Sequence, residues 1–78
     1  MPSFKTVDLH GSPNVEEAVS RLHSELYQAY IQKETLIRVV YGIGTGRLRQ
    51  AVLVELGRAG LVKSFNEEEG GASVLVRL

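Results

Sequence analysis

The sequence predicts an α+β domain in which a mixed four-stranded sheet is covered on one face by two helices. Three observations lead to this fold class. Alternating or β-branched runs, which favour strands, are separated by two runs with apolar residues at helical spacing, giving the order β-α-β-α-β-β. Each predicted helix has one apolar stripe, and a two-layer sandwich is the natural way to bury both. At 78 residues the chain holds one domain and no more.

The first predicted elements are a strand and a long helix. Residues 4–10 alternate between apolar and polar side chains, as a half-buried strand does, and residues 11–13 contain the glycine and proline that end it. Asn14 can then cap a helix, with Glu17 completing a capping box. We expect this helix to reach about Lys33, because apolar residues recur behind the cap at helical spacing. These residues are Val15, Ala18, Val19, Leu22, Leu26, Ala29 and Tyr30.

The second half of the chain predicts three further strands and one helix. Residues 35–41 are aliphatic and β-branched, and a strand here is parallel to the first because a helix connects the two. A glycine-rich turn over 42–46 leads into the second helix. Residues 61–65 predict a third strand, 66–71 a polar turn and 72–78 a fourth strand. The apolar face of the second helix consists of Leu48, Ala51, Val52, Leu56 and Ala59.

Composition excludes several classes of protein. The absence of cysteine rules out a disulfide scaffold, a thiolate zinc site and a cysteine nucleophile. No apolar run approaches the roughly 18 residues that a membrane helix needs, and the first residues do not form a signal peptide. We therefore expect a cytoplasmic protein with no membrane partner.

The charge of the chain is balanced overall but unevenly placed. Nine Lys and Arg against nine Asp and Glu give a formal net charge of zero, which argues against a strongly basic nucleic-acid binder. However, residues 1–37 carry a net charge of −2 and residues 38–63 a net charge of +4. A modest basic zone therefore surrounds the glycine turn. On the sheet face opposite the helices, Arg38 and Arg77 each interrupt an aliphatic strand and can add to this zone.

An Asp-x-His pair stands at the end of the first predicted strand. Asp8 and His10 lie two residues apart, so both project from one face, at the carboxyl end where α/β sheets usually present ligands. A carboxylate beside an imidazole can orient it or share a metal ion or a water with it. The alternative is structural: Asp8 accepts hydrogen bonds from the following turn and His10 ends the strand.

The glycine turn before the second helix is the other segment that points to chemistry. Gly42, Gly44 and Gly46 let backbone amides approach an anion, and the start of a helix adds positive potential there. Arg47 and Arg49 can grip a phosphate with forked geometry. The spacing matches neither the dinucleotide-binding fingerprint nor a P-loop. Phosphate contact is the interpretation we favour, and a tight structural turn with two exposed arginines is the alternative.

Three further features receive structural interpretations. The acidic run over 67–69 is expected to solvate a hairpin turn. His23 is expected to be exposed and idle in the middle of the first helix. Tyr27 and Tyr30 are expected to pack in the core or on the helix surface rather than to stack on bases.

These segments, in this order, resemble the Smr (small MutS-related) domain family. The resemblance is carried by residues 7–11, 15–18, 42–52, 62–65 and 70–78, and so covers nearly the whole chain. It implies a sandwich similar to the C-terminal domain of translation initiation factor three, in agreement with the order derived above. It also implies nucleic-acid binding and, as in many family members, endonuclease activity linked to DNA repair or recombination.

The resemblance also implies roles for individual residues. Asp8 and His10 match the family's acid-x-histidine motif, proposed to take part in cleavage, and the glycines of the turn match its second motif. Tyr41 stands where that second motif usually has histidine; if that histidine acts in catalysis, the present chain is a weak or inactive nuclease. A phenol can still donate a hydrogen bond to phosphate, but at neutral pH it is a poor base. The expected nucleic-acid contacts are Arg38, Tyr41, Gly42, Gly44, Thr45, Gly46, Arg47, Arg49 and Arg77.

The sequence leaves a choice of functions. The leading expectation is a single domain, residues 1–78, that nicks DNA or RNA, with Asp8 orienting His10 or a metal-bound water and His10 in acid–base work. No full set of metal ligands is recognisable, so dependence on Mg²⁺ or Mn²⁺ stays open. The alternative is a binding module for branched or structured nucleic acid, either a stand-alone protein or attached to MutS-like domains in a longer chain. A protein-interaction domain is the third class.

Overall fold

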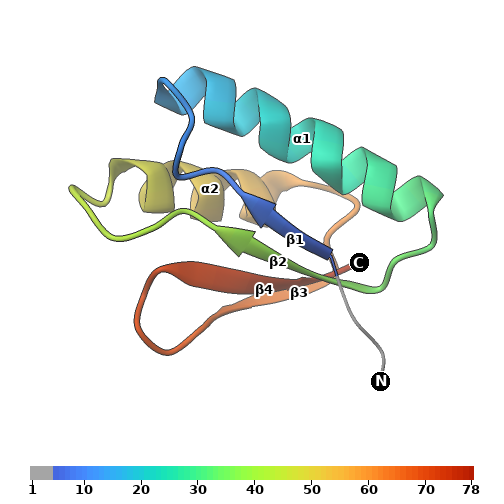
Figure 1. Ribbon diagram of the computed structural model, residues 1–78. Helices are drawn as coiled ribbons and strands as arrows, with labels where there is room; N and C mark the ends of the chain where they lie inside the picture. Colours follow the sequence, from blue (N-terminus) through green and yellow to red (C-terminus); the bar gives the residue numbers. More distant parts are fainter. Residues whose placement is uncertain (1–4) are drawn as a thin grey trace.

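The computed structural model describes residues 5–78, and its elements follow the predicted order (Figure 1). Phe4, part of the predicted first strand, lies outside the described residues. The elements are β1 (Lys5–Asp8), α1 (Val15–Ile31), β2 (Leu36–Val40), α2 (Arg47–Arg58), β3 (Ser64–Glu67) and β4 (Ser73–Arg77).

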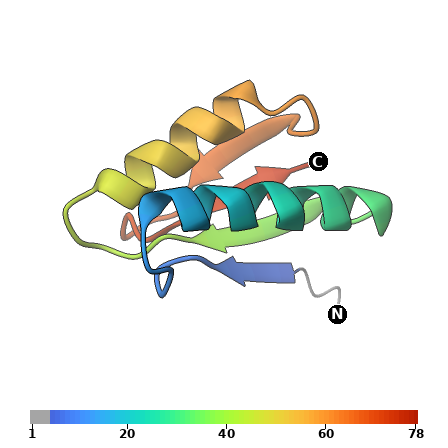
Figure 2. The ribbon, with the colours of Figure 1, turned by 90° about the horizontal axis from the view of Figure 1, so that it is seen from above.

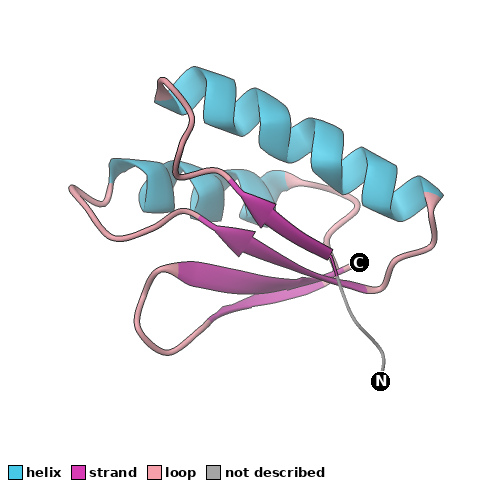
Figure 3. Cartoon of the chain, in the orientation of Figure 1, coloured by secondary structure: helices cyan, strands magenta, loops and turns pink. Residues whose placement is uncertain are grey.

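The four strands form one sheet in the order β1-β2-β4-β3. β1 and β2 are parallel, whereas β4 is antiparallel to both of its neighbours, so the sheet is mixed as predicted. Figure 2 and Figure 3 show the two helices side by side on one face, with the other face open. Because β1, β2 and β3 run in one direction, their carboxyl ends and the turn between β3 and β4 all lie at one end of the sheet.

The hydrophobic core lies between the sheet and the helices. Alternate residues of the strands point into it, as the two-residue period of a strand requires. Among residues 5–78 no polar or charged residue is buried with them. Tyr30 was expected on the apolar stripe of the first helix, but it is 55% exposed. The core residues are Val7, Leu9, Ala18, Leu22, Leu26, Ala29, Ile37, Val39, Tyr41, Val52, Leu56, Val74, Val76 and Leu78.

The first helix begins as predicted and ends slightly earlier. The side chain of Asn14 accepts a hydrogen bond from the amide of Glu17 at 2.8 Å, which confirms the cap. α1 ends at Ile31 rather than near Lys33, because Lys33 adopts the left-handed backbone conformation (φ +62°), through which a right-handed helix does not continue. Neither of the two described helices combines the length and the apolarity that crossing a membrane requires.

The third strand differs from its prediction. β3 begins three residues later than the predicted start at residue 61, and the following turn covers 68–72. Asn66 pairs with Leu75 of β4 although it is polar, so it belongs to the strand. The prediction was wrong because pairing with β4, rather than the run of apolar residues, sets the ends of β3. Leu61 and Val62 instead pack against the core from the preceding loop.

Candidate functional site

The candidate site depends on the parallel pairing of β1 with β2. Asp8 lies opposite Val40 in the register, and the amide of Leu9 donates to the carbonyl of Val40 at 2.8 Å, one residue beyond the end of β1. The two chains therefore leave the sheet together. This places His10, after β1, beside the glycine turn (residues 42–46) that follows β2, so the two predicted motifs meet at one edge.

Asp8 and His10 form a hydrogen-bonded pair. His10 Nδ1 lies 2.7 Å from Asp8 Oδ1, and the amide of His10 donates to the same oxygen at 3.0 Å. The side-chain hydrogen bond with His10, and then the backbone hydrogen bond, lower the pKa of the Asp8 carboxyl. The carboxyl is therefore ionised at neutral pH and accepts a hydrogen bond from the protonated Nδ1 of His10. Nε2 has no partner within residues 5–78, and in the neutral ring with Nδ1 protonated it is the nitrogen with the free lone pair. The imidazole is thus oriented by Asp8 and open to solvent.

Gly42 is where the second motif touches the first. Its backbone is left-handed, with φ +76°, and a Cβ added there would lie 3.1 Å from His10 Cβ. The amides of Tyr41 and Gly42 both donate to the carbonyl of Ala72, at 3.0 and 2.9 Å, which fixes this part of the turn on the β3–β4 hairpin. Glycine is therefore required at position 42 for its conformation and for the close approach of His10.

The rest of the glycine turn leaves amides free at the start of α2. Gly46 has φ +85° and supplies no side-chain cap, and the first turn of α2 has no acidic residue. The amides of Gly44, Thr45 and Gly46 have no acceptor in the described part of the chain. α1 differs, since Asn14 caps it and two acids stand in its first turn. The start of α2 therefore favours an anion from outside the domain.

Arg47 lies beside this turn with its side chain accessible to solvent. Its side chain is exposed and has no ion-pair or hydrogen-bond partner among residues 5–78. It lines a hollow of about 210 Å³ between residues 12–15 and residues 45–48, where the loop after His10 faces the glycine turn. It also lines a hollow of about 580 Å³ along residues 45–54. The surface around Arg47 is therefore concave and accessible to a phosphate.

Tyr41 and Arg49, two predicted contacts, are held by one carboxylate. Tyr41 is only 3% exposed, and its hydroxyl donates to Glu67 Oε1 at 2.7 Å. Arg49 donates to both oxygens of Glu67, from Nε at 2.5 Å and from Nη2 at 2.7 Å. Burial, followed by the hydrogen bond to Glu67, raises the pKa of Tyr41 to about 12, and the hydrogen bonds from Arg49 and then Tyr41 lower the pKa of Glu67 to about 2. Their contact with nucleic acid stays a prediction; the Tyr41 hydroxyl would have to leave Glu67 to donate to a phosphate, whereas Nη1 of Arg49 lies outside the bonds to Glu67.

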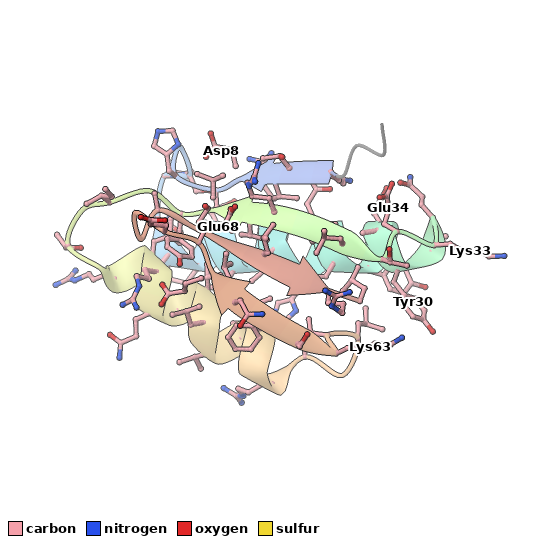
Figure 4. The ribbon with its side chains drawn as sticks, turned by 90° about the horizontal axis from the view of Figure 1, so that it is seen from below. Asp8, Tyr30, Lys33, Glu34, Lys63 and Glu68 are labelled. Atoms are coloured by element: carbon pink, nitrogen blue, oxygen red, sulfur yellow. The ribbon has the colours of Figure 1, made fainter. Side chains whose placement is uncertain are left out.

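Arg38 is held in a similar way on the open face of the sheet. Its Nε and Nη2 donate to the two oxygens of Glu68 at 2.6 and 2.9 Å, and Ser73 Oγ donates to Glu68 at 2.7 Å. Figure 4 shows Glu68 on this face. The prediction that the acidic run 67–69 only solvates a turn was therefore wrong for Glu67 and Glu68, which neutralise two arginines of the basic zone. Arg77 is exposed, and its contact also stays a prediction.

Two interactions of α1 had no local signal in the sequence. His23 Nε2 lies 2.7 Å from Glu55 Oε1 of α2, so the prediction of an idle histidine was wrong. Arg21 donates to the carbonyl of Asp8 at 3.0 Å and ties the end of β1 to α1. The partners are 32 and 13 residues apart in the chain, beyond the reach of helical or strand spacing.

The described residues do not form a complete metal site. Within 5–78, no three His, Asp or Glu side chains gather around a common point. Asp8 and His10 supply two donor groups, and the carboxylate is already hydrogen-bonded to the imidazole. Dependence on Mg²⁺ or Mn²⁺ stays a prediction, and no step below is derived through a metal.

A larger hollow lies away from both motifs. It measures about 690 Å³, and Tyr30, Lys33 and Lys63 are among its lining residues. Figure 4 shows these three residues toward the end of the sheet opposite Asp8. None of the residues that line it belongs to the Asp-x-His pair or the glycine turn, so we do not include it in the site.

The fold and the site together define a two-layer α+β domain with an acid–imidazole pair beside a glycine turn whose amides are free in the described residues. Residues 7–78 match the family model of the Smr domain, and the chain belongs to this family. The resemblance seen in the sequence is thereby confirmed, and the β-α-β-α-β-β order and mixed sheet that were predicted are those of the structure.

The chain is similar to a solved Smr domain and to parts of longer proteins named endonuclease MutS2. The crystal structure of the Smr domain of Thermus thermophilus MutS2 matches with a TM-score of 0.87 and 35% identity, covering 95% of this chain and 96% of that one. Endonuclease MutS2 of Aquifex aeolicus is 36% identical over an alignment of 79 residues, which covers 97% of this chain and 10% of that protein. Endonuclease MutS2 of Thermomicrobium roseum is 44% identical over 66 residues, covering 81% and 8%. The chain thus spans about a tenth of the length of these relatives.

Replacing Gly42 tests how the two motifs fit together. Gly42→Ala is expected to lower the free energy of unfolding by about 1–2 kcal/mol, because alanine resists the left-handed conformation, and to displace His10. Urea denaturation measures the first effect and the ring chemical shifts of His10 measure the second. Gly44→Ala is the matched control, since Gly44 has neither a left-handed backbone nor an atom within 4 Å of the added Cβ. Equal stability loss in the two variants would contradict this account.

The carboxylate of Glu67 predicts a pH-dependent contribution to stability. Its pKa falls from 4.5 to about 2 on folding, so the stabilisation is complete above pH 4.5 and is lost as the pH falls toward 2. We expect Glu67→Gln to lower the Tm at pH 7 and the difference from wild type to shrink over this acid range, as measured by circular dichroism. Glu69→Gln, two residues on in the turn that follows β3, is the control. A Tm difference for Glu67→Gln that does not change with pH would contradict the assignment.

Proposed function

We propose that this Smr domain is a nucleic-acid endonuclease domain that nicks phosphodiesters in DNA or RNA, within a longer chain that acts in DNA repair or recombination. The family and the relatives named endonuclease support the activity. The observation that carries the proposal is the exposed Asp8–His10 pair, joined at 2.7 Å and in contact with Gly42 of the turn. An oriented imidazole next to an anion-accepting turn is the arrangement that hydrolysis of a phosphodiester needs.

The arrangement supports a mechanism with separate binding and proton-transfer groups. The free amides at residues 44–46 and the guanidinium of Arg47 bind the phosphate and stabilise charge on its oxygens. Nε2 of His10 takes a proton from a water as its oxygen bonds to phosphorus and the bond to the leaving sugar oxygen breaks. Asp8 stabilises the imidazolium, which then returns the proton to the leaving oxygen.

A binding module without cleavage is the second candidate, and Tyr41 favours it. At the position where the family usually has histidine, this chain has a buried phenol whose hydroxyl donates to Glu67. The turn amides and Arg47 bind a phosphate whether or not cleavage follows. Branched or structured nucleic acid is then held for the attached domains of a longer chain.

Substitutions in the Asp-x-His pair distinguish these candidates. If the domain cleaves, His10→Ala should reduce nicking of supercoiled plasmid about 10²–10⁴-fold, the usual share of general acid–base catalysis, and Asp8→Asn should also reduce it. His23→Ala is the matched control, because its ring bonds to Glu55 and lies outside the site. The assay includes Mg²⁺, Mn²⁺ and EDTA arms. Unchanged nicking in both site variants would refute the proposed mechanism, and binding with no wild-type nicking in any arm would select the binding module.

Arg47 predicts a measurable electrostatic share of binding. Arg47→Ala should reduce the slope of log K against log salt by about one, because one phosphate contact and its released counterion are lost. Arg58→Ala, which removes an exposed arginine at the other end of α2, should leave the slope unchanged. Fluorescence anisotropy over a range of salt concentrations measures both. Equal slopes for wild type and Arg47→Ala would exclude this phosphate contact.

A further inference from the structure

Ile43 is an apolar side chain that the fold does not use. It is 82% exposed, more than any other large hydrophobic residue in the described part of the chain. It lies in the glycine turn between Gly42 and Gly44, so neither sequence neighbour has a side chain that could cover it. An exposed isoleucine contributes nothing to the core, and its burial becomes favourable only when something docks on the turn.

The groups around Ile43 indicate what docks there. On one side Gly42 contacts His10, and on the other the free amides of residues 44–46 lead to the unpaired guanidinium of Arg47. The Cα of Ile43 is about 3.8 Å from that of Gly42, the length of one peptide unit. A nucleic acid has an anionic phosphate that the amides can bind. It also has apolar base faces that lie within one nucleotide's length of that phosphate. The proposed phosphate site and an apolar contact to a base therefore occur side by side on this turn.

We propose that Ile43 contacts the face of a base next to the bound phosphate and holds that base out of its stack. This inference rests on the proposed nucleic-acid binding. Apolar side chains such as isoleucine act as wedges between base steps in other nucleic-acid-binding proteins. The cost of unstacking is smallest where a base is already unpaired, so the turn binds best where a base lies beside a bulge or other interruption. Ile43 thereby positions the substrate, while the chemistry stays with His10.

The test uses DNA and RNA duplexes with a single bulge, each carrying 2-aminopurine next to the bulge, and the matching duplexes without a bulge. Binding of the wild-type chain should raise 2-aminopurine fluorescence, because unstacking removes its quenching. Ile43→Ser should abolish most of this rise and weaken binding to the bulged probe about tenfold, the size of one base contact. The salt slope should stay the same, because no charge is lost. Ile43→Leu should retain the wild-type behaviour.

Ile31→Ser is the matched control, because Ile31 is 58% exposed at the far end of α1 and receives the same substitution. It should leave both the fluorescence and the affinity unchanged. The proposal is overturned if Ile43→Ser binds and unstacks the bulged probe like wild type, or if Ile43→Ser only dissolves a dimer seen by sedimentation. If wild type binds none of the probes, the proposed function fails and this proposal fails with it; if wild type binds but its fluorescence does not rise, only the role of Ile43 is refuted.

Discussion

The parallel register of β1 and β2 is the constraint on which the candidate site depends. Asp8 pairs with Val40, and the amide of Leu9 extends the ladder by one bond, so both chains leave the sheet at the same level. A slip of one residue would turn Asp8 toward the core and Val7 toward solvent, because side chains alternate along a strand. The buried Val7 and Leu9 exclude that slip. The hydrophobic core thus fixes where the imidazole of His10 meets Gly42.

The zero net charge of the chain has a structural explanation in the β3–β4 hairpin. Glu67 pairs with Arg49 of α2, and Glu68 pairs with Arg38 of β2. Two arginines of the basic zone therefore link α2 and β2 to the hairpin. These two ion pairs also cancel two positive charges of the basic zone in the long-range field of the protein. What remains near the glycine turn is Arg47 and the free amides. If the proposed binding occurs here, its attraction is therefore local and short-ranged, and depends on contact geometry more than on electrostatic steering.

The sequence predicted the parts of the structure that local patterns determine. The predicted order of elements, the Asn14 cap and the alternation around Asp8 were correct. Each of them depends on the pattern of only a few neighbouring residues. The parallel pairing of β1 and β2 was also predicted, and in the structure it places the Asp-x-His pair beside the glycine turn. The ends of β3, the partners of the acidic run and the bond of His23 to Glu55 were not predictable, because each depends on residues brought together only by the completed sheet and the packing of the helices. The hydrogen bond from the Tyr41 hydroxyl to Glu67 was not predictable for the same reason, since Glu67 lies 26 residues away.

Tyr41 also determines how any acid–base chemistry is distributed. With a pKa of about 12 its hydroxyl keeps its proton at neutral pH, and that proton is donated to Glu67. Tyr41 therefore cannot act as a base, and in the proposed mechanism proton transfer is left to His10. One imidazole is sufficient when its second nitrogen is held, because Nε2 can accept a proton during attack and return it to the leaving oxygen within the same turnover. The free amides of residues 44–46 carry no titrating group, so the phosphate binding proposed for this turn does not require the proton that the proposed cleavage must move.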